Sequence, residues 1–333
     1  PGSFVAVPQG IAIVPMGGEL FAVGSRADRV AGAIWGMLIA DALAMPVHWF
    51  YGGSSQIQKA FGRSMIQGFV QAPQGRGSFP QSIMSLSSTG TAGRGSDEGD
   101  IVGTVINHGM KQFWEQESGF HYHTTLSAGE CTLEGQMARL AVRHFAAGDF
   151  DRDRLQSEYV SFMTTPGAHN DAYCSSYHRL FFQRRATGIA LRDCPSNDNH
   201  NVDSIDGLVM PSVVLLATAE MPMERAIPLA QESVRVTRNS PRVEQFVVEH
   251  ATLLRAVLEG QPVGRVAQRA ATRLLGQAMD VSEPDPVVAC CASPCGGRTG
   301  HALRSACYVP PHEPLIRTVA GSQTSPCLAA PVN

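Results

Sequence analysis

The sequence predicts an all-α fold, a compact domain built from many helices. Apolar residues recur with helical spacing in segment after segment between residues 26 and 280, and the alternation typical of half-buried strands is scarce. The chain has 333 residues, of which 44% are hydrophobic and 17% are charged. This composition is typical of a folded protein with a large core and excludes a disordered chain. A net charge of −3 gives no electrostatic basis for binding nucleic acid.

The first expected helix covers residues 26–46, and its apolar part, residues 30–47, contains one carboxylate, Asp41. Because an ionised carboxylate is costly to bury without partners, we expect Asp41 to be buried and hydrogen-bonded beside a polar site. Pro46 ends this helix soon after Asp41. Small residues at every fourth position leave one face open to the close approach of another backbone: Gly32, Gly36, Ala40 and Ala44.

A membrane-spanning helix is the alternative for this run, which is long enough to cross a bilayer. Asp41 within it and the small residues along it favour a helix packed inside a protein. We therefore expect no membrane attachment and a cytoplasmic protein with free thiols.

The remaining elements are expected in chain order. Residues 1–25 form a loose leader, and residues 51–96, rich in Gly, Ser, Gln and Pro, form a long loop. Residues 281–333 form an irregular tail rich in Pro, Cys and Gly, so the domain covers residues 26–280. Between the loop and the tail we expect helices over residues 97–117, 127–147, 151–163, 172–187, 203–219, 223–236, 241–258 and 264–279.

Individual residues support several of these boundaries. Asp151 and Ser240 are expected N-caps, and Pro241 suits the first helical position. Gly148 and Gly260 are expected to end their helices. Pro228 is expected to kink or break the helix over residues 223–236.

The most specific motif lies at residues 36–48, Gly-Met-Leu-Ile-Ala-Asp-Ala-Leu-Ala-Met-Pro-Val-His. It resembles the opening signature of the ADP-ribosylglycohydrolase superfamily, in which Gly and apolar residues precede Gly-Asp-Ala-Leu-Gly, an apolar residue and Pro. Ala40 and Ala44 replace two glycines of that signature, and His48 stands where Glu is common. The resemblance covers roughly residues 28–260 and implies a compact all-α domain with a cleft for ADP-ribose. A buried helix whose Asp41 caps a neighbouring loop is the structural alternative.

The resemblance also implies a reaction and a metal. The family hydrolyses an N- or O-glycosidic bond to ADP-ribose, and Mg²⁺ with carboxylates holds the ribose and activates water. The family's Thr-Asp-Asp-Thr segment corresponds here to residues 85–89, which offer only hydroxyls, and its C-terminal Asp-x-Asp-Thr motif is absent. Asp97, Glu98 and Asp100 come later and are better explained as charge at a helix N-terminus. Because Mg²⁺ prefers carboxylates among its ligands, we expect weak or absent binding.

Two polar runs and one arginine are further candidates for a ligand site. The run from residue 164 to residue 171 precedes a helix, where phosphate or ribose can be held. In the run from residue 197 to residue 206, two carboxylates three residues apart are expected on one side of a starting helical turn. Helix capping is the structural alternative there. An arginine ahead of the helix at Pro241 replaces a family His and can pair with a diphosphate, unless it is a surface residue.

His121 and His123 alternate as on a short strand. Two histidines on one face can bind a metal, but no third ligand is apparent. We therefore expect them to be hydrogen-bonded structural histidines.

These observations predict a hydrolase that cleaves a glycosidic bond to ADP-ribose in a protein or a small molecule. The alternative is a non-catalytic homologue that binds ADP-ribose or has a structural role, because the acidic metal motifs are missing or displaced. No metal ligands can be assigned. The expected catalytic residues are Asp41, Asp203 and Asp206, and the expected substrate-binding residues are His48, Ser87, Ser88, Thr89, His169, Asn170, Asp171, His200, Asn201 and Arg238.

Overall fold

The computed structural model describes residues 24–85, 101–115 and 119–275. These residues form nine α-helices and no strand, which confirms the predicted all-α fold. The helices are α1 (Arg26–Ala44), α2 (Gly53–Phe61), α3 (Leu133–Ala146), α4 (Arg152–Thr164), α5 (Ser176–Ala186), α6 (Val209–Ala217), α7 (Met223–Val234), α8 (Pro241–Leu258) and α9 (Val263–Leu275).

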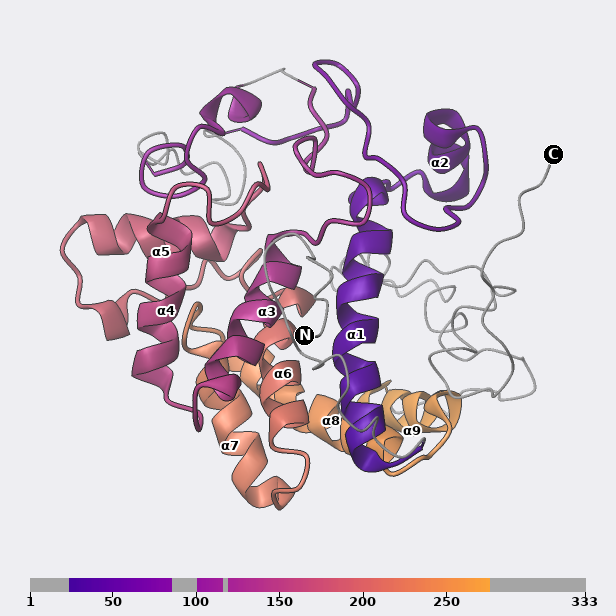
Figure 1. Ribbon diagram of the computed structural model, residues 1–333, viewed down its shortest axis with the longest axis vertical. Helices are drawn as coiled ribbons and strands as arrows, with labels where there is room; N and C mark the ends of the chain where they lie inside the picture. Colours follow the sequence, from indigo (N-terminus) through magenta and orange to yellow (C-terminus); the bar gives the residue numbers. More distant parts are fainter. Residues whose placement is uncertain (1–23, 86–100, 116–118, 276–333) are drawn as a thin grey trace, which may run out of the picture.

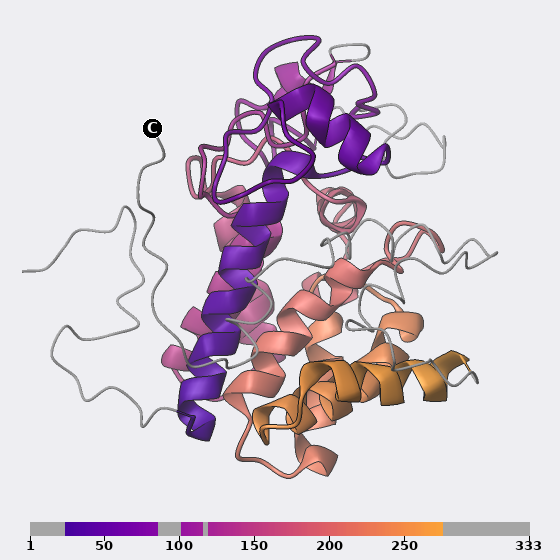
Figure 2. The same cartoon turned by 90° about the vertical axis from the view of Figure 1, so that its right-hand side faces the viewer.

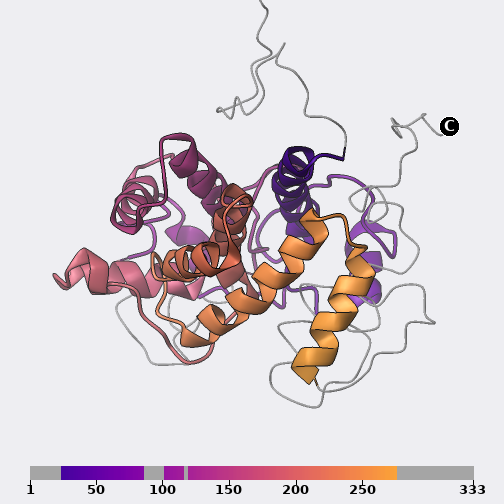
Figure 3. The ribbon, with the colours of Figure 1, turned by 90° about the horizontal axis from the view of Figure 1, so that it is seen from below.

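Helix α1 runs along one side of the domain, with α3 and α6 beside it (Figures 1 and 2). The long connections that follow α1 and precede α3 gather over the C-terminal end of α1. At the other end, α1 contacts α8, which packs against α7 and α9, and Figure 3 shows this end of α1 beside the last two helices. The arrangement leaves the C-terminal end of α1 covered by irregular chain, where polar side chains can meet.

The main core lies between α3, α4, α5 and the connection that leads into α3. Its largest side chains are aromatic and fully buried: Trp114, Tyr122, Tyr159, Phe181 and Phe182. A second cluster joins α6, α7 and α8 through small and branched residues. Trp114 and Tyr122 lie in the connection that leads into α3. Because each of these buried rings removes a large apolar area from water, the core holds this connection as well as the helices.

The expected caps are confirmed. The carboxylate of Asp151 accepts a hydrogen bond from the Arg154 backbone N–H at 3.0 Å, and the Ser240 hydroxyl accepts one from the Val243 N–H at 3.1 Å. Helix α7 continues without a break through Pro228. Proline removes one backbone donor, and this helix tolerates the loss.

Two expectations for the connections were wrong. Residues 101–115 form turns and one short 3-10 helix (Lys111–Trp114) in place of a helix, because Gly103, Asn107 and Gly109 all adopt positive φ. A Cβ on Gly103 would also lie 2.7 Å from the Lys111 Cβ. The predicted loop after α1 contains α2, whose single buried residue, Ile57, gives too weak an apolar period to be recognised.

The small-residue face of α1 does not receive another backbone in the described part of the chain. Gly32, Ala40 and Ala44 are exposed, and a Cβ on Gly32 would meet no atom within 4 Å. The buried side of α1 is instead formed by Leu38 and Ala42.

Within the described residues, α1 and the turn after it (Arg26–Val47) are long and apolar enough to cross a membrane, judged by length and composition alone. Hydrogen bonds tie the first turn of this helix to the rest of the domain. Arg26 donates to the Ala219 carbonyl and Arg29 to the Leu258 carbonyl. These contacts pack the N-terminal turn of α1 against α8 and the end of α6.

Candidate functional site

Asp41 receives its predicted polar partners from the start of α3. The backbone N–H of Thr132 donates to Oδ2 at 2.7 Å, and the Thr132 hydroxyl donates to Oδ1 at 2.6 Å. Burial raises the pKa of Asp41, and the two Thr132 bonds oppose that shift. Thr132 is the N-cap residue of α3 but makes no side-chain bond to its own helix, because its hydroxyl is used by Asp41.

Gly135 allows this contact between α1 and α3. A Cβ at this position would lie 2.5 Å from Oδ2 of Asp41 and 2.8 Å from the Cβ of Cys131. Only glycine therefore lets the carboxylate reach the first turn of α3. The requirement is steric, since Gly135 lies inside a regular helix.

Asp171 caps the same helix from the segment before α5. Its buried carboxylate accepts hydrogen bonds from the backbone N–H groups of Leu133, at 2.8 Å, and Tyr173, at 3.1 Å. Two carboxylates thus meet the N-terminus of α3, where the helix dipole favours negative charge.

A chain of two imidazoles continues from Asp171 to the end of α1. Nδ1 of His123 lies 2.9 Å from Oδ1 of Asp171, and Nε2 of His123 lies 2.8 Å from Nδ1 of His48. The two ring planes are nearly parallel, with an angle of 19° between them and centroids 4.9 Å apart. His121 accepts a bond from the His123 backbone N–H. Burial lowers the pKa of His48 well below its usual range and that of His121 to about 3, so both are neutral at neutral pH.

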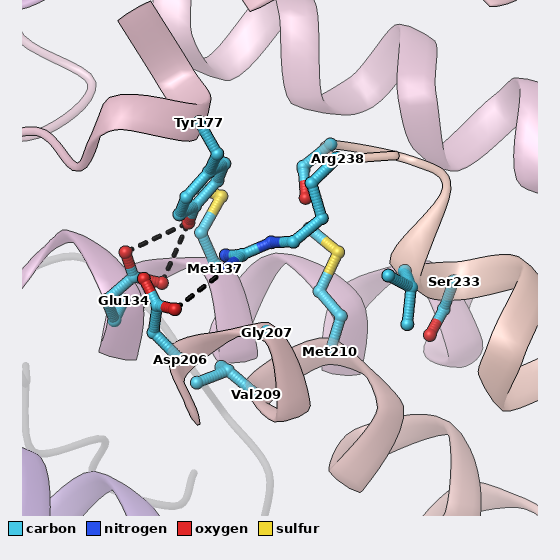
Figure 4. Close-up of a pocket in the computed structure, with 11 residues that line it drawn as sticks. Glu134, Met137, Tyr177, Asp206, Gly207, Val209, Met210, Ser233 and Arg238 are labelled. Carbon is cyan, nitrogen blue, oxygen red and sulfur yellow. Dashed lines mark hydrogen bonds and ion pairs between the residues drawn. The ribbon is translucent and has the colours of Figure 1, made fainter. Parts of the chain in front are cut away.

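A second polar cluster is formed by Glu134, which lies in the first turn of α3, together with Tyr177, Asp206 and Arg238 (Figure 4). Arg238 is buried, donates to Oδ1 of Asp206 at 2.8 Å, and has its guanidinium carbon 3.7 Å from the Tyr177 ring centroid. The Tyr177 hydroxyl contacts both oxygens of Glu134 at 2.9 and 2.8 Å. Arg238 therefore pairs directly with Asp206, and its charge also acts on the neighbouring carboxylate of Glu134.

The cavity in this second cluster is small. Its volume is about 10 Å³, enough for about one water molecule and far too small for ADP-ribose. Burial, helped by the charge of Asp206, raises the pKa of Glu134 to about 8. This cluster is an internal charged network as the structure stands.

The comparison with known families decides the identity of the domain. The profile of the ADP-ribosylglycohydrolase family matches residues 23–324. The chain belongs to the ADP-ribosylglycohydrolase family. The match extends beyond residue 260, the expected end of the resemblance in the sequence. A search of curated proteins found no match.

Of the site residues expected for an ADP-ribosylglycohydrolase, the structure brings three together. Asp41, His48 and Asp171 come from α1, the turn after it and the segment before α5, and they meet through Thr132, Leu133 and His123. His123, which lies in a turn and not on a strand, was expected only as a structural histidine. The spacing of His121 and His123 was the only sequence signal for a site here. The partners of His123, Asp171 and His48, are remote in the sequence, so the network could not be predicted.

The other expected site residues are separated from this network or from one another. Asn170 is exposed and donates to Glu130, and the Nδ1 atom of His169 is buried without a partner among the described residues. Asp203 accepts hydrogen bonds from Asn197 and Ser240, whereas Asp206 pairs with Arg238.

His200 is exposed and its backbone N–H bonds to Asp198, as does the Asn201 side chain. The roles assigned to these residues remain predictions. Ser87, Ser88 and Thr89, the acids at positions 97, 98 and 100, and most of the expected leader and tail lie outside the described residues.

The family typically depends on a metal, and the described residues do not fit one. No group of three or more His, Cys, Asp or Glu side chains suited to a metal occurs among them. All four carboxylate oxygens of Asp41 and Asp171 already accept hydrogen bonds from protein donors. We therefore expect isothermal titration with Mg²⁺ to show weak or no binding. Tight stoichiometric binding would contradict this and would point to the acids at positions 97, 98 and 100.

Replacing Asp41 by alanine is expected to lower the free energy of unfolding by about 1–3 kcal/mol, because two donors of Thr132 lose their acceptor. Urea unfolding measures the change. The matched control is Thr132→Val, and the double variant should lose less than the sum of the two single losses. Additive losses, or an Asp41→Ala protein as stable as the parent, would contradict the contact.

Glu134 should make stability depend on pH. Its pKa rises from an ordinary 4.5 to about 8 on folding, so the folded protein keeps a proton that the unfolded chain releases. The contribution is complete below pH 4.5 and is lost as the pH rises to about 8. Urea unfolding at pH 5 and pH 8 should show a larger loss for the parent than for Glu134→Gln. An equal loss in both proteins would refute the assignment.

Proposed function

We propose that this protein hydrolyses a glycosidic bond between ADP-ribose and an acceptor group, and that the reaction takes place at the C-terminal end of α1. Membership of the ADP-ribosylglycohydrolase family supports the class of substrate. The observation that carries the location is the network in which Asp41, His48 and Asp171 meet at the start of α3.

The network has the chemical groups that such a hydrolysis needs. Attack of water at the anomeric carbon requires a group that removes a proton, and departure of the acceptor requires a proton donor. Imidazoles and carboxylates perform both tasks at neutral pH. Here they are held by backbone bonds to α3 and by buried aromatic rings, which fixes their positions before a substrate binds.

ADP-ribose binding without hydrolysis is the second candidate. It is favoured by the fact that every carboxylate oxygen of Asp41 and Asp171 is already hydrogen-bonded within the protein. Such a protein would retain the ligand and leave the glycosidic bond intact.

Incubation with peptides ADP-ribosylated on arginine and on serine, followed by measurement of free ADP-ribose, separates the two candidates. We expect release from at least one peptide. A titration with ADP-ribose on the same protein shows whether the ligand binds. Binding without release would support the non-catalytic candidate, and neither binding nor release would exclude both.

A further inference from the structure

The positions of the protons in the chain from Asp171 to His48 follow from its hydrogen bonds. The Asp171 carboxylate accepts hydrogen bonds from the backbone N–H groups of Leu133 and Tyr173, and its third partner is Nδ1 of His123. Nδ1 of His123 must then carry a hydrogen, which leaves its Nε2 as the acceptor in the neutral ring. Nδ1 of His48 therefore donates to that Nε2 at 2.8 Å. The remaining ring nitrogen of His48, Nε2, keeps its lone pair.

This last nitrogen is the open end of the chain. His48 is partly exposed, whereas His123 and Asp171 are 3% and 1% exposed. Nε2 of His48 has no hydrogen-bond partner among the described residues, and it is not one of their buried unpaired side-chain atoms. The chain thus runs from a buried carboxylate to a ring nitrogen whose lone pair is not used by any described residue.

We propose that Asp171, His123 and His48 form a proton relay in which Nε2 of His48 takes the proton from the attacking water. This inference rests on the proposed hydrolysis. The water oxygen bonds to the anomeric carbon as its proton moves to Nε2 of His48, and the acceptor group leaves with the electron pair of the glycosidic bond. The hydrogen on Nδ1 of His48 passes to Nε2 of His123. The reverse passage returns a proton from Nε2 of His48 to the leaving group.

The surroundings determine where the positive charge rests. Around His48 lie the rings of Trp49, Tyr122 and Tyr173, with centroids 5.2, 5.5 and 5.6 Å away. Two other histidines, 121 and 123, disfavour charge on it. His123 contacts the Asp171 carboxylate directly and is close enough to Asp41 to affect its pKa. A proton passed inward along the chain therefore moves toward the carboxylates of Asp171 and Asp41, and Nε2–H of His48 is left facing the substrate as an acid.

Backbone strain beside His48 supports a function at this place. Trp49 has a φ of 60°, an unfavourable value for a bulky residue. Strain of this kind is held only where the surrounding contacts impose it, and it is frequent at functional sites. The Trp49 ring packs edge-on against the Tyr122 ring, with ring centroids 4.4 Å apart, and this contact fixes the turn that carries His48.

The protonation pattern can be measured without activity. Long-range ¹H–¹⁵N spectra of the full chain labelled on histidine nitrogens, assigned with single variants, distinguish protonated from unprotonated ring nitrogens. At neutral pH we expect hydrogen on Nδ1 of both His48 and His123 and an unprotonated Nε2 on His48. Hydrogen on Nε2 of His48 in the neutral protein would overturn the relay.

The rate of ADP-ribose release by variants tests whether the relay is used in the reaction. His48→Gln should slow ADP-ribose release by about 10²–10⁴-fold with little change in affinity for ADP-ribose, since the variant loses only the base. His123→Gln and Asp171→Asn should slow release less and alter its dependence on pH, because they act through His48. His250→Gln is the control, as its Nε2 lies 2.8 Å from the Ser212 hydroxyl in α6 and the residue is outside the relay.

The outcomes are distinct. An unchanged rate for His48→Gln, or a His123→Gln protein with the pH profile of the parent, would refute the relay while hydrolysis stands. If the parent binds ADP-ribose but releases none, the proposed hydrolysis fails, and with it the catalytic role of His48. The nitrogen spectra still decide the arrangement of protons.

Discussion

Replacing Gly135 by alanine is expected to destabilise the protein by about 3 kcal/mol, a large loss for one methyl group. The new Cβ would lie 2.5 Å from the carboxylate oxygen of Asp41 and 2.8 Å from the Cβ of Cys131. Neither neighbour can move freely, because Asp41 is held by Thr132 and Cys131 belongs to the chain entering α3. The contact between α1 and α3 must open, and the donors of Thr132 lose their acceptor.

Gly32→Ala is the matched control for this variant. Gly32 also lies inside a helix, but among the described residues no atom outside its own helix backbone lies within 4 Å of the position its Cβ would take. The control should gain about 0.5–1 kcal/mol, the usual advantage of alanine over glycine in a helix. Urea unfolding of both variants measures the effect. A Gly135→Ala protein as stable as the parent would show that α1 and α3 do not approach as described.

The second large effect is expected for Arg238→Met, at about 3–5 kcal/mol of lost stability. Arg238 is 2% exposed, pairs with Asp206 and acts through its charge on Glu134. Without it, the half-buried carboxylate of Asp206 must stay charged and lose its ion pair or take up a proton. Arg235→Met is the control, because Arg235 forms surface ion pairs with Glu232 and Glu244 and should cost at most about 1 kcal/mol.

Adding Asp206→Asn to the Arg238 variant should restore part of the loss, since it removes the charge left unpaired. Thermal unfolding of the parent, of Arg238→Met, of Asp206→Asn and of the double variant gives the coupling energy between the two residues. Equal losses for Arg238→Met and Arg235→Met would contradict the buried position of Arg238.

The features predicted correctly from the sequence are those that depend on local order. The apolar period gave nearly all the helices, and Ser240 and Asp151 gave their caps. Asp41 was expected to have polar partners because an isolated carboxylate in an apolar helix needs them. Its partner, Thr132, was not predicted, since nothing in the sequence indicates which helix start will approach α1.

The missed features depend on contacts between remote segments. Glu134 is in the first turn of an amphipathic helix, where acidic residues are ordinarily explained by the helix dipole, and only the position of Arg238 gives it another role. His123 looked like a structural histidine because its partners, Asp171 and His48, are far from it in the chain. Residues 101–115 were expected to be helical because the acids at positions 97, 98 and 100 suit a helix N-terminus, and the positive φ at Gly103 and Gly109 was not foreseen.

The most direct test of the account is a crystal structure of the protein with ADP-ribose. The account predicts density for the ligand at the C-terminal end of α1, touching the segment of residues 169–171 and with the ribose within hydrogen-bond reach of Nε2 of His48. Density confined to another surface, or no density at a saturating concentration of ligand, would contradict it.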